Sequence, residues 1–283
     1  MIAYLGTGLL GSAFVRALLG RGETVHVWNR SGDKAKSLEQ FGAKAFTNAA
    51  DAVRDAERIH LTLSVDAAVD GVLQQIQGAV PSSTPIVDHT TTAPAPTGER
   101  ARRLAQMGIS FLHAPVFMGP PNALAGTGVM MASGDRARFD AVSPHLEKMT
   151  GKLVYLGVDP SRAAAMKLLG NHFIIAVTTG LMDTLALAKA MNVPQDQVTE
   201  LLSFFNPGAM AEVRLARVRA ADYANPSWNL GMARKDVRLM QAEAAAGNMP
   251  MVMLPAVAAL MDDEIAKGRV ADDWTVIASR VLE

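Results

Sequence analysis

The sequence predicts an N-terminal α/β domain with a mostly parallel, doubly wound sheet, followed by an all-α domain. Two observations predict this. Short segments rich in β-branched residues alternate with helical patterns as far as Tyr155, and such alternation is typical of a parallel sheet with helices on both faces. From Ser161 the alternation stops, and a long, largely apolar helical pattern runs to about Met191 with no convincing strand after it. We therefore expect domains at residues 1–158 and 159–283, joined by the long helix.

The chain opens with an apolar run that leads directly into glycines at positions 6, 8 and 11. A strand, Gly-x-Gly-x-x-Gly and a helix in this order are typical of the Rossmann fold. The glycines allow a tight turn, close approach of a pyrophosphate to the backbone, and close packing of the helix on the sheet. The alternative is a glycine-rich turn without a ligand. We expect a dinucleotide pyrophosphate at the N-terminal end of the helix predicted over Ser12–Leu19, held by the loop residues Gly6, Thr7, Gly8, Leu9, Leu10 and Gly11.

The second strand, Thr24–Trp28, ends at Asn29, Arg30 and Ser31. In this fold the adenosine ribose is bound about 20 residues after the glycines, and an NAD site places Asp or Glu there. This segment has no carboxylate, whereas Arg30 can pair with a 2′-phosphate and the other two side chains can donate hydrogen bonds. An ordinary polar loop is the alternative. The segment favours NADP(H) over NAD(H).

The remaining N-terminal elements follow in order. We predict a helix over Gly32–Phe41 and a short one over Ala49–Asp55 with Asn48 as its N-cap. Because ligands lie beyond the carboxyl ends of strands in such sheets, Leu63 and Ser64 are candidates to flank the cofactor. The further strands are predicted at Ala43–Phe46, Arg58–Ser64, Pro85–Asp88, Phe111–Ala114, Val129–Ser133 and Leu153–Tyr155.

The pattern of the C-terminal part predicts helices separated by clusters of Asn, Pro and Gly. We expect its first helix, about 30 residues long, to be buried between the domains and against a second subunit. The other helices are predicted at Pro194–Phe205, near Ala209–Ala221, at Trp228–Ala246, at Met251–Lys267 and around Trp274.

Composition excludes several classes of protein. The net charge is zero, so no strongly basic surface invites nucleic acid or anionic lipid. The chain has no cysteine, and its six histidines show no metal-binding spacing, so we expect no metal. No apolar run reaches the roughly 18–20 residues of a membrane span without charged or helix-breaking interruption, and the N-terminus enters the first strand at once. We therefore expect a cytoplasmic protein without a membrane partner.

The long helix carries a lone lysine among small residues. Lys167 and Asn171 are four residues apart and share one helix face with Ala163, Ala164, Gly170 and Ile174. This surrounding indicates a cavity wall, but the pattern alone equally allows a first-turn lysine that extends to water.

Several motifs together resemble the β-hydroxyacid dehydrogenase family, which includes 3-hydroxyisobutyrate dehydrogenases and glyoxylate/succinic semialdehyde reductases. The resemblance covers nearly the whole chain. The matching segments are Gly6–Gly11, Asp88–Pro94 (the family's D-x-S-T), His113–Gly119 (its D-x-P-V-S-G-G), Gly157–Asn171, and Lys235-Asp236 followed by Leu239. The third segment departs from the family, because His113 replaces its aspartate and Phe117 and Met118 replace its serine and first glycine.

The resemblance implies hydride transfer between NADP(H) and a small carbonyl or hydroxy-acid substrate. It makes Lys167 the proton donor or acceptor and Asn171 the residue that orients the lysine or the substrate oxygen. Thr91 would lie beside the nicotinamide, and Lys235 would reach the cofactor or substrate unless it is a solvated surface charge. The substrate residues implied are Thr90, Phe117, Met118 and Gly119. The family also implies a homodimer or homotetramer.

Two other functions stay open at this stage. An imine reductase or reductive aminase has the same two-domain plan. These enzymes generally lack the lysine, although the apolar Phe117-Met118 pair mildly favours this reading. A sensor that binds a dinucleotide without turnover belongs to a different class, and the presence of both Lys167 and Asn171 argues against it.

Overall fold

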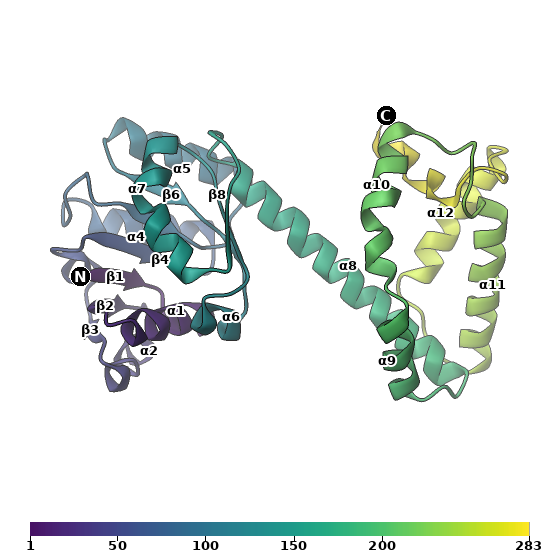
Figure 1. Cartoon of the computed structure of the whole chain (residues 1–283), viewed down its shortest axis with the longest axis horizontal. Coiled ribbons are helices and arrows are strands. Elements are labelled where there is room, and N and C mark those ends of the chain that lie inside the picture. The colour runs from purple at the N-terminus through teal and green to yellow at the C-terminus, as the bar shows by residue number, and fades with distance from the viewer. Residues whose placement is uncertain (283) are drawn as a thin grey trace. The chain divides into compact units, whose positions relative to one another are not determined.

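The computed structural model describes residues 1–282. Contacts within the chain divide it into two compact units, Met1–His172 and Phe173–Glu283, which Figure 1 draws in purple to teal and in green to yellow. Helix α8 (Arg162–Ala190) therefore belongs to both units, whereas the sequence places the boundary just before this helix. The physical reason is that the first turns of α8 pack on the N-terminal unit, where Ala163 is fully buried and donates its N–H to Ser133 Oγ at 2.9 Å.

Six parallel strands form the main sheet, as the sequence predicts. They are β1 (Ile2–Leu5), β2 (Val25–Trp28), β3 (Lys44–Phe46), β4 (Arg58–Leu61), β5 (Ile86–Asp88) and β6 (Phe111–His113), in the spatial order β3-β2-β1-β4-β5-β6. The strand order reverses between β1 and β4. In open parallel sheets such a reversal leaves a crevice beyond the carboxyl ends of the strands, where ligands bind.

A separate three-stranded sheet corrects one prediction. The segments predicted to continue the parallel sheet, β8 (Val129–Ala132) and β9 (Lys152–Tyr155), instead pair with each other. β8 also pairs with the two-residue strand β7 (Val116–Phe117), which was not predicted. β7 runs antiparallel to β8, and an isolated bridge between His113 and Ser133 links β6 to β8. A two-residue strand has no periodicity to detect, and pairing between distant segments is not visible in a local pattern.

Two hydrophobic clusters, one on each face of the sheet, explain why β1 is apolar at every position. Because successive side chains of a strand point to opposite faces, Ile2 and Tyr4 enter one cluster and Ala3 and Leu5 the other. The covering helices are α1 (Leu9–Gly20), α2 (Gly32–Lys36), α3 (Ala49–Val53), α4 (Asp66–Ile76), α5 (Pro94–Gln106), α6 (Pro120–Ala125) and α7 (Arg136–Leu146).

Local details of these helices partly match the predictions. The N-cap is confirmed, because Asn48 Oδ1 accepts the N–H of Ala50 at 2.8 Å. The single helix predicted over residues 32–41 is wrong. It breaks after α2 into a 3₁₀ turn at Glu39–Phe41, where Ser37 Oγ donates to the Lys34 carbonyl at 3.0 Å. Serine side chains compete in this way with helical backbone hydrogen bonds.

The C-terminal unit is helical, as predicted. After α8 come α9 (Gln195–Phe204), α10 (Ala211–Ala220), α11 (Leu230–Ala246) and α12 (Leu254–Ala266), with 3₁₀ turns at Pro207–Met210 and Trp274–Val281. Asp183, buried on α8, accepts the N–H groups of Val252, Met253 and Leu254 at 2.7–3.0 Å. These are orphan donors at the start of α12, so one carboxylate fixes this helix end to α8.

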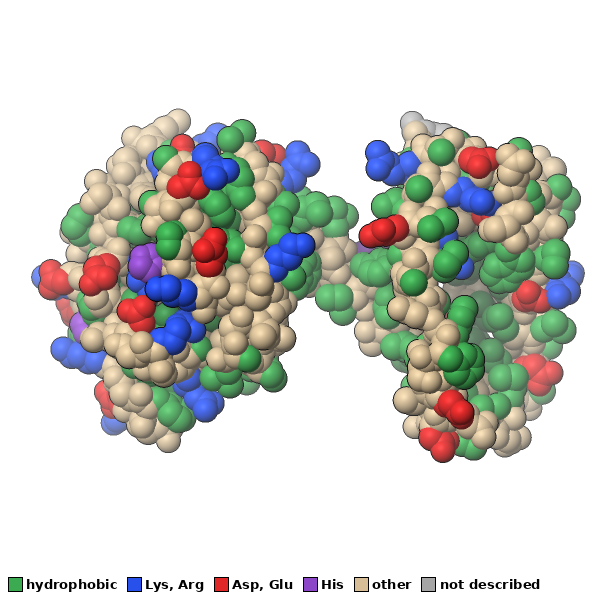
Figure 2. Space-filling model, in the orientation of Figure 1, with side chains coloured by type: hydrophobic (Ala, Val, Ile, Leu, Met, Phe, Trp, Pro, Cys, Tyr) green, Lys and Arg blue, Asp and Glu red, His purple; other side chains and the backbone are tan. Residues whose placement is uncertain are grey.

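Helix α8 leaves most of its apolar surface uncovered in the single chain. It contains an 18-residue window with a mean hydropathy of 1.5, of which 11% is buried. By length and composition it could therefore cross a membrane, which corrects the expectation that no segment qualifies. The mean stays high because the polar residues Asn171, His172 and Asp183 are few; the central helix of a soluble protein passes the same test. Exposed apolar side chains continue on α9 and α10, at Phe204, Phe205, Val213 and Leu215, and Figure 2 shows hydrophobic groups on this unit in green.

Candidate cofactor and active site

A cavity of about 650 Å³ lies beyond the carboxyl ends of the central strands, at the reversal of strand order. The loops after β1, β2, β4 and β5 line it together with the start of α1 and one face of α4. The structure thus brings together most of the predicted cofactor and loop residues: Gly6, Gly8, Leu9, Leu10, Asn29, Arg30, Ser31, Leu63, Ser64, Thr90 and Thr91. Thr7, in the loop after β1, and Gly11, in the first turn of α1, are buried and do not line the cavity.

Each glycine of the first loop has a distinct physical requirement. Gly6 has φ +99°, and a Cβ there would lie 2.1 Å from the Thr62 carbonyl oxygen. A Cβ on Gly11 would lie 2.0 Å from the Gly6 carbonyl oxygen, so neither position accepts a side chain. At Gly8 no atom lies within 4 Å of the Cβ position. The second glycine therefore faces open space at the N-terminus of α1, whose first amides have no helical partner. These residues fit a bound pyrophosphate.

The loop after β2 contains an asparagine that is hydrogen-bonded within the protein and is followed by positively charged side chains that line the cavity. Asn29 Oδ1 accepts the Thr7 N–H at 3.1 Å and its Nδ2 donates to the Ser31 carbonyl at 3.0 Å, so this side chain ties the first two loops together. Among the described residues that line the cavity, the charged ones are Arg30 and Lys34, and none is acidic. Lys34 was not among the predicted cofactor residues. Its position one helical turn after Arg30 is the signal that could have found it.

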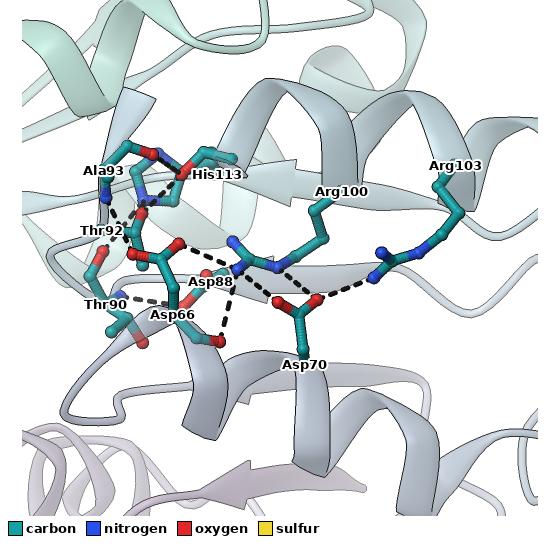
Figure 3. A network of polar contacts seen from close by, with 10 residues as sticks. Asp66, Asp70, Asp88, Thr90, Thr92, Ala93, Arg100, Arg103 and His113 are labelled. Carbon is teal, nitrogen blue, oxygen red and sulfur yellow. Dashed lines mark hydrogen bonds and ion pairs between the residues drawn. The ribbon is translucent and has the colours of Figure 1, made fainter. Parts of the chain in front are cut away.

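A buried network holds the loop after β5 (Figure 3). Thr90 donates its N–H to Asp88 Oδ1 at 2.9 Å, its hydroxyl accepts the Leu63 N–H at 2.9 Å, and its carbonyl accepts His113 Nε2–H at 2.9 Å. Burial raises the pKa of the Asp88 carboxyl and lowers the pKa of the His113 imidazole. Three directions of hydrogen bonding thus fix Thr90, and the exposed Thr91 follows it at the cavity wall.

Arg100 on α5 anchors the same loop from its other end. Its guanidinium is buried and donates to Asp70 at 3.0 Å and to Asp66 at 2.9 Å, both on α4. Asp66 Oδ2 also accepts the N–H of Ala93 at 3.0 Å. The hydrogen bond from Arg100 lowers the pKa of Asp70. The segment between β5 and α5 is therefore clamped on both sides, as Figure 3 shows.

Two stacked histidines, His60 and His89, lie at the cavity, and His89 forms part of its lining. His89 Nδ1 is 2.7 Å from the Ala114 carbonyl oxygen, which can only accept, so Nδ1 carries the proton. His89 Nε2 then accepts from His60 Nδ1 at 2.9 Å, and the rings stack at 10°. Both rings are buried; burial lowers the pKa of His89 to about 4 and that of His60 well below its usual range. The pair is neutral in the folded protein.

Lys167 is buried on α8 and does not line the cavity of about 650 Å³. Its side chain is 9% exposed, so it does not extend to water, and Ala163 and Ala164 beside it are fully buried. Nζ lies 4.1 Å from the ring centroid of Phe117. Burial lowers the pKa of Lys167. Asn171 is half-buried on the same helix face.

The loop at residues 117–119 uses its own groups internally. The Phe117 ring lies against Gly170, the Met118 side chain packs on the core, and the Gly119 N–H donates to Asn122 Oδ1 at 3.0 Å. The Gly119 N–H is therefore used within the loop, and the side chains of Phe117 and Met118 are apolar, so no side chain of these three residues can donate a hydrogen bond to an anionic substrate.

The remaining candidate, Lys235, lies on α11 in the C-terminal unit. Its Nζ pairs with Asp236 Oδ1 at 2.7 Å, and its side chain is exposed. Its predicted contact with cofactor or substrate stays a prediction. Within residues 1–282, no group of three or more His, Asp or Glu side chains is arranged to hold a metal ion.

Comparisons with known proteins extend over the whole chain. A family model described as the NAD binding domain of 6-phosphogluconate dehydrogenase matches residues 1–157. The 3-sulfolactaldehyde reductase of Escherichia coli (strain K12) is 26% identical over 99% of this chain and 95% of its own length. The 2-(hydroxymethyl)glutarate dehydrogenase of Eubacterium barkeri is 24% identical over 98% and 93%. A solved imine reductase of Streptomyces aurantiacus has a TM-score of 0.90 at 26% identity, covering 100% of this chain and 99% of that one.

Proposed function

Because this chain belongs to the β-hydroxyacid dehydrogenase family of NAD(P)-dependent oxidoreductases, we propose that it is an NADPH-dependent reductase of a small carbonyl compound, with Lys167 as the proton donor. The observation that carries the proposal is the buried Lys167 ammonium on a helix whose neighbouring side chains are small. Bound NADPH would supply the hydride to the carbonyl carbon. Lys167 Nζ would give a proton to the carbonyl oxygen as negative charge develops there, and water would restore the ammonium.

The lowered pKa of Lys167 supports this role, because burial weakens the hold of the amine on its proton. Asn171, one turn further on α8, would orient the lysine or the substrate oxygen. In the opposite direction, the neutral amine would accept the proton of a hydroxyl group. Thr91 would lie beside the nicotinamide, and Thr90 would lie beside the substrate. Lys235, in the C-terminal unit, would contact the cofactor or the substrate.

We propose NADP(H) as the preferred cofactor. Arg30 and Lys34 supply positive charge at the cavity edge where the ribose phosphate would lie, and Ser31 adds a hydroxyl donor. No described residue lining the cavity carries a carboxylate that would repel that phosphate. The glycine loop and the first amides of α1 would hold the pyrophosphate.

The substrate of this proposal is an uncharged aldehyde or ketone. The Gly119 N–H is already bonded to Asn122, and Phe117 and Met118 have apolar side chains, so this loop gives a carboxylate no side-chain donor. The decisive measurement is NADPH oxidation with apolar aldehydes and ketones beside glyoxylate, succinic semialdehyde and tartronate semialdehyde. Turnover of a carbonyl compound supports the proposal, and a protein that binds NADPH without accelerating any of these reactions contradicts it.

Imine reduction is the second candidate, favoured by the likeness to the Streptomyces aurantiacus imine reductase and by the apolar loop at 117–118. Cyclic imines in the same assay separate the two. Faster turnover of imines than of every carbonyl compound would favour imine reduction, and tight NADPH binding without any turnover would favour a sensor.

We also propose that the protein is a cytoplasmic homodimer or homotetramer. Several apolar side chains of α8, among them Leu169, Phe173 and Ile175, are more than half exposed in the single chain. Asn171 and His172 interrupt this surface, which fits a protein partner better than lipid. Light scattering during gel filtration without detergent tests the subunit number.

A further inference from the structure

The aromatic ring of Phe117 takes the place of an anionic partner for Lys167. Nζ lies 4.1 Å from the Phe117 ring centroid, within the range of a cation–π contact. In the part of the N-terminal unit that the structure describes, no carboxylate lies within ion-pair distance of this ammonium, and burial alone accounts for its lowered pKa. The face of an aromatic ring carries the negative part of its quadrupole.

Gly170 explains how the ring comes to lie there. It follows Lys167 by three residues, so the two positions share one face of α8. A Cβ on Gly170 would lie 2.2 Å from Phe117 Cζ and 2.7 Å from Cε1, closer than atoms can approach. Glycine inside a helix is unfavourable relative to alanine. Here its missing side chain leaves the space that the Phe117 ring occupies.

The backbone of Phe117 is fixed independently of α8. Phe117 pairs with Val129 in the second sheet, and the Gly119 N–H donates to Asn122 Oδ1 at 3.0 Å two residues later. At Gly128, a Cβ would lie 2.9 Å from the Phe117 carbonyl oxygen, so this neighbour is packed closely as well. The ring thus projects from a rigid support toward α8.

From these contacts we propose that Phe117 is a positioning residue, whose ring face holds the ammonium group of Lys167 while Gly170 provides the seat for the ring. The proposal rests on the proposed function only where it concerns turnover. Burial disfavours the ammonium form and the ring favours it, so the two act in opposite directions on the same group. Phe117 therefore keeps the lysine protonated, and able to donate, to a higher pH than burial alone would allow.

The kinetic test compares pH profiles of NADPH-dependent reduction. Phe117→Leu keeps apolar volume and removes the ring face, and Gly170→Ala keeps the ring but displaces it. In both variants the basic limb of the kcat profile should move down by roughly 0.5–1.5 pH units, whereas Phe117→Tyr keeps the wild-type limb. The matched control is Phe41→Leu, which removes the ring beneath Arg16 at 4.5 Å on the protein surface and should leave the limb in place.

A second readout does not depend on activity. In protein labelled with ¹³C at lysine Cε, the ring current of Phe117 should shift the Lys167 methylene signal upfield, and Lys167→Arg identifies that signal by its loss. Phe117→Leu should return the signal to the position of the other lysines, and Phe117→Tyr should not. An unchanged signal and an unchanged basic limb in Phe117→Leu would overturn the proposal. Full turnover in Lys167→Ala would instead overturn the proposed function, with the labelled signal still reporting on the contact.

Discussion

The stacked pair His60 and His89 predicts a loss of stability on mild acidification. Both imidazoles are buried and neutral in the folded protein, with the pKa of His89 at about 4 and that of His60 also well below its usual range. In the unfolded chain a histidine titrates near pH 6.5. Below about pH 6.5 the unfolded state therefore binds more protons than the folded state, so the free energy of unfolding falls as the pH falls.

The size of the effect follows from these values. Each buried histidine lowers the free energy of unfolding by about 1.4 kcal/mol per pH unit between the unfolded and folded pKa values. For His89 this amounts to about 2 kcal/mol at pH 5, and His60 acts in the same direction because burial lowers its pKa as well. Asp88 acts in the opposite direction, because burial raises its pKa and acidification then favours the folded state.

The assay is urea denaturation of the wild type and of His60→Phe at several pH values between 7 and 5. The substitution keeps a ring stacked on Tyr4 and removes one titrating group, and the contribution of Asp88 is common to both proteins. The free energy of unfolding of the variant should fall less steeply with pH than that of the wild type, whatever its stability at pH 7. A wild type equally stable at pH 7 and pH 5, or a variant with the full wild-type slope, would refute the reasoning.

Three further predictions concern the site and its support. Lys167→Ala should lower kcat by about 10²–10⁴-fold and leave the NADPH affinity nearly unchanged, because Lys167 does not line the dinucleotide cavity. Steady-state kinetics measure kcat, and fluorescence titration measures the affinity. A variant with normal turnover removes the lysine from the mechanism. Arg30→Ala should weaken NADPH by about tenfold or more and NADH much less, because the guanidinium faces the cavity without a carboxylate nearby; equal losses for both cofactors reject the phosphate assignment. Asp183→Ala should lower the free energy of unfolding by about 2 kcal/mol or more, because three N–H groups lose their acceptor; chemical denaturation measures it, and an unchanged midpoint argues against this role.

The main sheet, the glycine loop and the long helix were predictable because their signals are local. The apolar run before Gly6 and the spacing of Gly6, Gly8 and Gly11 define strand, turn and helix within a dozen residues. The absence of a carboxylate after Trp28 is equally visible in the sequence. The second sheet was not predictable, because β7 has two residues and its partner β8 follows a helix.

The side-chain networks behind the site could not be read from the sequence. The hydrogen bond between His60 and His89 depends on β4 and β5 being neighbours, and the contact of Phe117 with Gly170 joins segments 53 residues apart in number. The ion pair of Arg100 with Asp66 likewise requires the packing of two helices. Individual residue types suggested chemistry at positions such as Lys167, whereas their partners depend on tertiary arrangement.

The double anchoring of the segment from Asp88 to Ala93 has a consequence for how a ligand enters. Thr90 is held by three hydrogen bonds and Ala93 by Asp66, so contacts within the protein fix the conformation of this wall of the cavity without a ligand. Preorganisation of this kind removes the entropic cost of ordering a loop on binding. The association rate of the dinucleotide should then be set by diffusion and by electrostatic attraction to Arg30 and Lys34 at the rim. This rate should depend markedly on ionic strength, and it should depend on solvent viscosity no more than diffusion itself does.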